Sequence, residues 1–220
     1  MSNVNGRRVL KFREFVFVQT IAQRLSRRRI SPNQISIASI FFAIFGSICF
    51  LLLPNSSSTG KWLLPIFAAV FIQCRLLCNL FDGMVAIEGG KKTYSGELFN
   101  DIPDRISDAL LLVSAGYAIS IISWGNTLGW CAALLAVLTA YVRTLAASIG
   151  APVNFQGPMA KQHRMALLTV ACIITAIENS FSDQSYALLA AMIIMIVGCF
   201  ITFYRRTMSA YRFLEHDDHS

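Results

Sequence analysis

The chain has 220 residues, of which 55% are hydrophobic and 14% are charged, and its mean hydropathy is +0.56. This composition is too apolar for a typical soluble domain, and several apolar runs are long enough to cross a bilayer. The formal net charge of +7 does not indicate a nucleic-acid-binding protein, because the Lys and Arg residues are distributed as membrane topology requires.

The segment before the first span, residues 1–30, mixes Phe and Val with Lys and Arg. Over residues 9–29 this pattern predicts an amphipathic helix on the membrane surface, attracted to anionic lipid. A basic flank that only fixes the topology is the alternative. Ser31 and Pro32 then form a favourable helix start, and the first span is predicted at residues 35–53.

Five more helices are predicted, and the first of them ends in an acidic stretch. They cover residues 62–81, 97–122, 128–149, 159–177 and 186–204. Residues 31–206 are therefore expected to form a six-helix core, followed by a polar, frayed tail at residues 207–220. At this length the whole chain, residues 1–220, is one integral-membrane domain.

The basic residues predict the orientation. The N-terminal flank, the connections at residues 83–103 and 150–164 and the C-terminal tail hold nearly all Lys and Arg, whereas the other three loops contribute only Lys61. By the positive-inside rule, both termini are cytoplasmic. The predicted fold class is an all-α, polytopic membrane protein with six transmembrane helices and an N-terminal amphipathic surface helix.

Acidic residues are concentrated in one stretch of this apolar chain. Six of the 12 acidic residues lie between Asp82 and Asp108. Asn79 and Asp82 share one helix face, and Asp101, Asp104 and Asp108 share another. Two carboxylates ~6 Å apart repel by roughly 3 kcal/mol at an effective dielectric constant of about 20. Several of them together therefore favour a bound cation or raised pKa values.

Oxygen ligands without His or Cys partners suit Mg²⁺, Mn²⁺ or Ca²⁺, and such an ion at a membrane surface suits phosphate chemistry. The alternative is a set of solvated helix ends that are acidic because the helix dipole favours carboxylates at N-termini. That alternative fits Glu97 and Asp101 but poorly explains Asp82 and Asp108. The spacing therefore favours a metal site.

The acidic stretch resembles the signature of the CDP-alcohol phosphotransferase family, the class-I CDP-alcohol phosphatidyltransferases. In that signature an Asp precedes Asp-Gly by three positions, Ala-Arg follows, and a Gly precedes two Asp residues at four-residue intervals. The matching positions here are Asp82, Gly83, Ala86, Gly96 and Asp104. The six spans and Asn33, which follows Pro32, extend the resemblance over most of the chain.

Three positions depart from the signature. Asn79 and Asn100 stand where the first and third Asp are expected, and Ile87 replaces the Arg. Amide oxygens still bind cations, and Asp101 is the favoured replacement for the lost charge. Other carboxylates in the stretch are Asp108, Glu97 and Glu88. Some bacterial family members also carry Asn at both positions. An active variant is favoured over a decayed site, which is not expected to keep the matching positions together.

The resemblance implies transfer of a phospho-alcohol from a CDP-linked donor to a hydroxyl acceptor, with release of CMP, in phospholipid biosynthesis. CDP-diacylglycerol is the expected donor, because a lipid donor explains an active site that opens to the bilayer. The acceptor is a small polar alcohol or a phosphorylated alcohol. The resemblance also implies a homodimer in the bacterial inner membrane, surrounded by lipid, with the active site at its cytoplasmic face.

The same resemblance assigns site residues by position. In the family two divalent ions, Mg²⁺ or Mn²⁺, hold the pyrophosphate, and the last Asp of the signature is the general base, here Asp104. The implied metal ligands are Asn79, Asp82, Asn100, Asp101 and Asp104. The implied CDP-binding residues are Asn33, Asp82, Gly83, Ala86 and Gly96. Asp108 and Glu97 are possible supporting carboxylates.

A basic group at the same side completes the expected site. The resemblance implies that Arg143, Lys161 and Arg164 bind the acceptor phosphate, and an Arg guanidinium suits a bidentate phosphate contact. Flanking charge that only sets topology is the alternative, and for Lys161 alone it is the stronger one. Arg75, inside the second span, is predicted to be the structural partner of an acid or an interfacial lipid contact.

Two other functions stay open from the sequence. One is a catalytically disabled family member that binds CDP-lipid or nucleotide without turnover. The other is a small transporter or channel with an acidic cation site, which six spans allow but which does not require the glycine-spaced signature.

Overall fold

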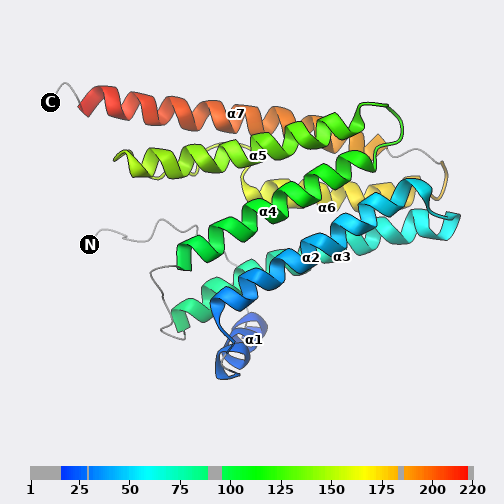
Figure 1. Cartoon of the computed structure of the whole chain (residues 1–220), viewed down its shortest axis with the longest axis horizontal. Helices are drawn as coiled ribbons and strands as arrows, with labels where there is room; N and C mark the ends of the chain where they lie inside the picture. The colour runs from blue at the N-terminus through cyan, green and yellow to red at the C-terminus, as the bar shows by residue number, and fades with distance from the viewer. Residues whose placement is uncertain (1–15, 29, 89–95, 183–185, 218–220) are drawn as a thin grey trace.

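The computed structural model describes residues 16–28, 30–88, 96–182 and 186–217, and no strand occurs within these ranges. The predictions for residues 1–15 and for the connection at residues 89–95 lie outside them. The all-α fold is confirmed (Figure 1). The helices are α1 (Val16–Arg27), α2 (Pro32–Leu52), η2 (Leu53–Asn55), α3 (Ser58–Glu88), α4 (Gly96–Tyr117), α5 (Gly125–Ser148), α6 (Lys161–Glu178) and α7 (Tyr186–Asp217).

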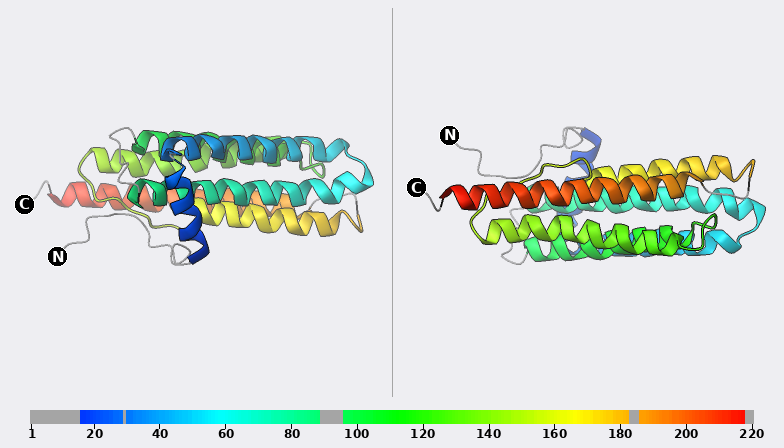
Figure 2. Two further views of the ribbon diagram at one scale, coloured as in Figure 1. Left: turned by 90° about the horizontal axis from the view of Figure 1, so that it is seen from below. Right: turned by 90° about the horizontal axis from the view of Figure 1, so that it is seen from above.

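The six long helices form a closed ring, in which each helix makes its most extensive contacts with two neighbours, in the order α2, α3, α6, α7, α5, α4 and back to α2. Figure 2 shows the ring as two layers, with α2, α4 and α5 in one and α3, α6 and α7 in the other. Helix α1 lies across one end of the bundle and contacts α3. The first residues of α2, α4 and α6 and the last residues of α3, α5 and α7 lie at that same end (Figure 1).

Local sequence explains where α2 begins and how two helices come close together. The Ser31 hydroxyl accepts from the Gln34 N–H at 3.2 Å, and the Ser31 N–H donates to the Gln34 side chain at 3.0 Å. This capping box precedes Pro32 in the first turn. On α4 and α5, a Cβ on Gly116 would lie 2.6 Å from Gly129 Cα, so only glycine permits this contact between the two backbones.

Four helices, α2, α3, α5 and α7, have the length and hydropathy of membrane spans. Helices α4 and α6 fall below that hydropathy because each carries charged residues in its first turns. The 22 residues of α4 nevertheless extend about 33 Å, enough to cross a hydrocarbon core. The chain is thus an all-helical protein with four clear candidate spans, and the six-span topology stays a prediction.

Three predicted boundaries were wrong. The helix predicted to end at residue 122 ends at Tyr117, because the chain turns there into α5, whose Gly125 carbonyl lies against Gly116. Helix α3 continues to Glu88 instead of ending near residue 81, because Met84 and Val85 are buried against Ala22 of α1. The expected frayed tail at residues 207–220 is helical as far as Asp217. Two hydrogen bonds fix this part of α7 to the α5–α6 connection. Arg206 Nε donates to the Gln156 carbonyl at 3.0 Å, and Asn154 Nδ2 donates to Ser209 Oγ at 2.8 Å.

Candidate functional site

Asp82 of α3 is buried between helices. Asp82 is 5% exposed, and Ser36 Oγ of α2 donates to its Oδ2 at 2.6 Å. The sequence had indicated that Asp82 and Gly83 lie at the end of the helix. Because α3 continues to Glu88, they lie inside it. This hydrogen bond engages one of the two carboxylate oxygens of Asp82.

Asn79 lies one turn before Asp82 on α3. Both polar atoms of its amide are buried, and neither has a hydrogen-bond partner among the described residues. Leaving a buried amide unpaired costs free energy. An orphaned amide oxygen beside a buried carboxylate is therefore a site that a cation would stabilise.

The acidic face of α4 points into the ring, and its deepest member is Asp108. The Asp108 side chain is 2% exposed. Arg75 of α3 donates to it at 2.6 Å and Arg164 of α6 donates to it at 2.8 Å. Arg75 is fully buried. Of the two roles predicted for Arg75, the structural partner of an acid is confirmed.

Asp104 lies one turn nearer the end of the bundle and is also buried. Arg75 donates to its carboxylate at 3.4 Å and to its backbone carbonyl at 3.2 Å. Lys161 Nζ, at the start of α6, contacts the other carboxylate oxygen. Both oxygens of the predicted general base therefore face cationic side chains. Asp82 is close enough to Asp104 and Lys161 to interact with both electrostatically.

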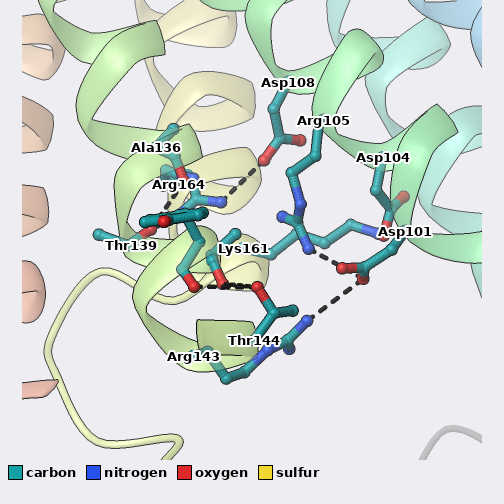
Figure 3. A network of polar contacts seen from close by, with 12 residues as sticks. Asp101, Asp104, Arg105, Asp108, Ala136, Thr139, Arg143, Thr144, Lys161 and Arg164 are labelled. Atoms are coloured by element: carbon teal, nitrogen blue, oxygen red, sulfur yellow. Dashed lines mark hydrogen bonds and ion pairs between the residues drawn. The ribbon is translucent and has the colours of Figure 1, made fainter. Parts of the chain in front are cut away.

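Asp101 lies nearly one turn closer to the start of α4 than Asp104. Arg105 donates to it at 3.0 Å and Arg143 of α5 donates to it at 3.2 Å. The Arg143 guanidinium also lies 5.7 Å from the ring centre of Phe155. Figure 3 shows the two arginines converging on Asp101 while Arg164 reaches Asp108 from α6. Asp101 is thus engaged by arginines, although the sequence favoured it as a replacement for Asn100.

Two residues that the sequence did not single out, Thr139 and Arg206, take part in hydrogen bonds that join α5 to α6 and α7. Arg164 donates to Thr139 Oγ1 at 3.3 Å and to the Met159 carbonyl at 3.1 Å. Arg206 of α7 donates to the Thr139 carbonyl at 2.7 Å. Ser36 was missed as well. Serine and threonine are common in apolar helices, so no pattern marked Ser36 or Thr139. Arg206 lies just beyond the predicted sixth span and had the pattern of ordinary flanking charge.

The remaining predicted site residues lie at the same end of the bundle. Asn33 is in the first turn of α2, Gly83 and Ala86 follow Asp82 on α3, and Gly96 begins α4. Asn100 lies one turn before Asp104 and is half-buried. The side chain of Glu97 is outside the described part of the structure. The backbone thus brings the two halves of the signature to one end of the ring.

The donor set determines what ion the site can hold. Among the described residues, no three carboxylate, imidazole or thiol side chains converge as metal ligands. An ion here depends on amide oxygens together with carboxylates. Asn79 and Asp82, one turn apart on α3, fit an oxygen-binding divalent ion that keeps part of its coordination for phosphate or water.

Comparison with known proteins places this fold. The family model described as CDP-alcohol phosphatidyltransferase matches residues 29–204. Phosphatidylinositol phosphate synthase (PgsA1) of Mycobacterium tuberculosis, in complex with manganese and citrate, aligns with a TM-score of 0.74 and 18% identity over 88% of each chain. No curated protein matches the chain.

Two further structures of the mycobacterial enzyme share the fold. With CDP-DAG bound it aligns with a TM-score of 0.72 and 19% identity, covering 88% of this chain and 93% of that one. Its apo form aligns with a TM-score of 0.69 and 19% identity, over 87% and 95% of the two chains.

Proposed function

The chain belongs to the CDP-alcohol phosphatidyltransferase family and is a transferase of phosphate-containing groups, and from this premise we propose its reaction. It transfers a phosphatidyl group from CDP-diacylglycerol to a small hydroxyl acceptor and releases CMP. The observation that carries the proposal is that Asp82 of α3 and Asp104 of α4 are both buried at the same end of the ring, where Arg75 of α3 binds Asp104.

The donor and the metal are supported by the solved relatives. The mycobacterial enzyme has been solved with CDP-DAG and with manganese. In this chain the ligands for Mg²⁺ or Mn²⁺ would come from among the signature positions Asn79, Asp82, Asn100 and Asp104, with Asp101 next to them. The ion would neutralise negative charge on the pyrophosphate and so assist phosphoryl transfer. Asn33, Gly83, Ala86 and Gly96 lie at the same end of the bundle and would receive the cytidine diphosphate.

Asp104 is the proposed general base. The acceptor oxygen forms a bond to the phosphorus that carries the diacylglycerol, and the bond from that phosphorus to CMP breaks. The acceptor proton passes to the Asp104 carboxylate, which Arg75 holds through two contacts, one to its backbone carbonyl and one to its side chain. Lys161, on the other carboxylate oxygen, supplies positive charge where the reaction concentrates negative charge.

The acceptor is proposed to bind beside Arg143 and Lys161. Their side chains are 27% and 24% exposed, so an incoming phosphate or polar alcohol can reach them. Arg164 was predicted for the same role, but its side chain is 3% exposed and bonded to Asp108. Its burial supports a positioning role better than direct contact with an acceptor.

The membrane arrangement is proposed from the charges. With α2 to α7 all crossing the bilayer, the site, α1 and the basic connections lie at the cytoplasmic face by the positive-inside rule. In α4 and α6 the charged turns that lower the hydropathy point into the ring, where they pair with each other and not with lipid. A bacterial inner-membrane homodimer remains part of this proposal.

The test is CMP release by purified protein supplied with CDP-diacylglycerol, Mn²⁺ or Mg²⁺ and a panel of polar alcohols and their phosphates. We expect metal-dependent CMP release that Asp82→Ala and Asp104→Ala abolish, whereas Lys61→Met, at the opposite end of the bundle, leaves it unchanged. Binding of the CDP-lipid without CMP release from any acceptor would instead support a ligand-binding protein without turnover.

A further inference from the structure

The site carries an internal cation next to its proposed base. Lys161 Nζ contacts Asp104, and the Lys161 side chain is only 24% exposed. Arg75 contacts the other carboxylate oxygen of Asp104. The negative charge of the Asp104 carboxylate is therefore paired, at both oxygens, with cationic side chains of the protein.

The surrounding charges are also balanced. Three acids that face the interior, Asp82, Asp104 and Asp108, are accompanied by three cations. These are Arg75, Lys161 and Arg164. The three acids are thus matched in number by cations of the protein, in contrast to the acid-rich site expected from the sequence. Each added divalent ion brings two positive charges that only the incoming pyrophosphate can balance.

In the described part of the site, few oxygen atoms remain free of cationic side chains and able to ligate a metal ion. Asn79 offers an amide oxygen with no partner among the described residues, and Asp82 offers the carboxylate oxygen that Ser36 does not bind. Two protein oxygens, completed by phosphate and water, make an ordinary Mg²⁺ or Mn²⁺ site. They do not suffice for two ions, and the Asp104 oxygens are occupied by cationic side chains.

We propose that this site holds one divalent ion, bound by Asn79 and Asp82, and that the Lys161 ammonium takes the place that a second ion would occupy beside Asp104. One N–H of Lys161 is directed to Asp104, and the other two are available to pyrophosphate or acceptor oxygens. This inference rests on the proposed function and specifies its metal content. It also gives a reason for Asn at positions 79 and 100, because fewer negative charges suit fewer metal ions.

The test counts bound ions directly. Purified protein in detergent with CDP is titrated with Mn²⁺, and free Mn²⁺ is measured by electron paramagnetic resonance against a blank that contains CDP alone. The wild type should bind one Mn²⁺ per protomer. Asn100→Asp and Lys161→Arg should each still bind one, whereas the double variant Lys161→Met with Asn100→Asp should bind two. Lys61→Met is the matched control and should bind one.

Two tight Mn²⁺ ions per wild-type protomer would overturn the proposal, as would a double variant that still binds one while eluting as a folded particle with wild-type helical content. Because the wild-type count needs no variant, a misfolded double variant leaves that part of the test decisive. The proposed function fails separately, through absence of CMP release by protein that binds Mn²⁺. CMP release together with two bound ions would contradict only this inference.

Discussion

Two acids two turns apart on α4 have similar partners but different surroundings. Asp108 accepts from Arg75 and Arg164, and Asp101 accepts from Arg105 and Arg143. The Asp108 side chain is 2% exposed, whereas that of Asp101 is 35% exposed. Separating a buried pair leaves charges that water cannot reach, but separating an exposed pair exchanges protein contacts for hydration. The inner cluster, Asp108 with Arg75 and Arg164, is thus suited to hold helices together. The outer cluster, Asp101 with Arg105 and Arg143, is suited to exchange partners with a ligand.

The largest effect is expected from the inner cluster. Asp108→Asn leaves Arg75 and Arg164 buried without their main counter-charge, so the free energy of unfolding should fall by about 3–5 kcal/mol. The measurement is thermal unfolding in detergent, followed by helical circular dichroism. If Asp108→Asn and Asp101→Asn lower the stability equally, the proposed difference between the two clusters is wrong.

The next effect concerns the ion held beside the inner cluster. Ser36→Ala removes the hydrogen bond that orients Asp82. Loss of such an orienting partner typically weakens metal binding about 10- to 100-fold, and we expect a loss in that range for Mn²⁺. The matched control is Ser39→Ala, because Ser39 donates to a backbone carbonyl of α2 and not to Asp82. Similar Mn²⁺ affinities for the two variants would contradict the role assigned to Ser36.

A smaller effect is expected at the outer cluster, where the acceptor is proposed to bind. Arg143→Ala should raise the KM for a phosphorylated acceptor about tenfold, equivalent to about 1.4 kcal/mol of binding. The KM for CDP-diacylglycerol should stay within about twofold, since Arg143 lies on α5, whose neighbours in the ring are α4 and α7 and not α3. Steady-state kinetics with each substrate varied in turn distinguishes the two. A change in the donor KM alone would assign Arg143 to the nucleotide.

The smallest effect is expected from the exposed acid itself. Asp101→Asn should change the free energy of unfolding by about 0–1 kcal/mol, as is usual for exposed ion pairs. It should also free Arg143 to bind an anionic acceptor, so the acceptor KM is expected to fall or stay constant. A loss of metal binding in this variant, measured with Mn²⁺, would instead support the metal-ligand role predicted from the sequence.

Much of this fold was predictable from the sequence because its strongest signals are local. The apolar runs located the helices, and Ser31 with Pro32 marked the start of α2. The end of α3 was not predictable, since it depends on the burial of Met84 and Val85 against α1. The helical end of α7 likewise depends on Arg206 and the distant α5–α6 connection.

The candidate site was predictable in its membership but not in its pairings. Signature spacing singled out Asp82 and Asp104, and Arg75 stood out as an arginine within a span. Which cation faces which acid follows from the ring order, in which α6 lies between α3 and α7. No sequence pattern encodes that order, so the contact between Lys161 and Asp104 became apparent only from the structure.

The most direct test of the proposed reaction follows the donor phosphorus. CDP-diacylglycerol labelled at the phosphate next to the lipid is incubated with the protein, Mn²⁺ and the acceptor that gives the fastest CMP release. We predict that the label remains with the lipid in a new phospholipid, that CMP is unlabelled, and that Asp104→Asn forms neither product. Label recovered in a water-soluble nucleotide, or equal product formation by Asp104→Asn, would contradict the account.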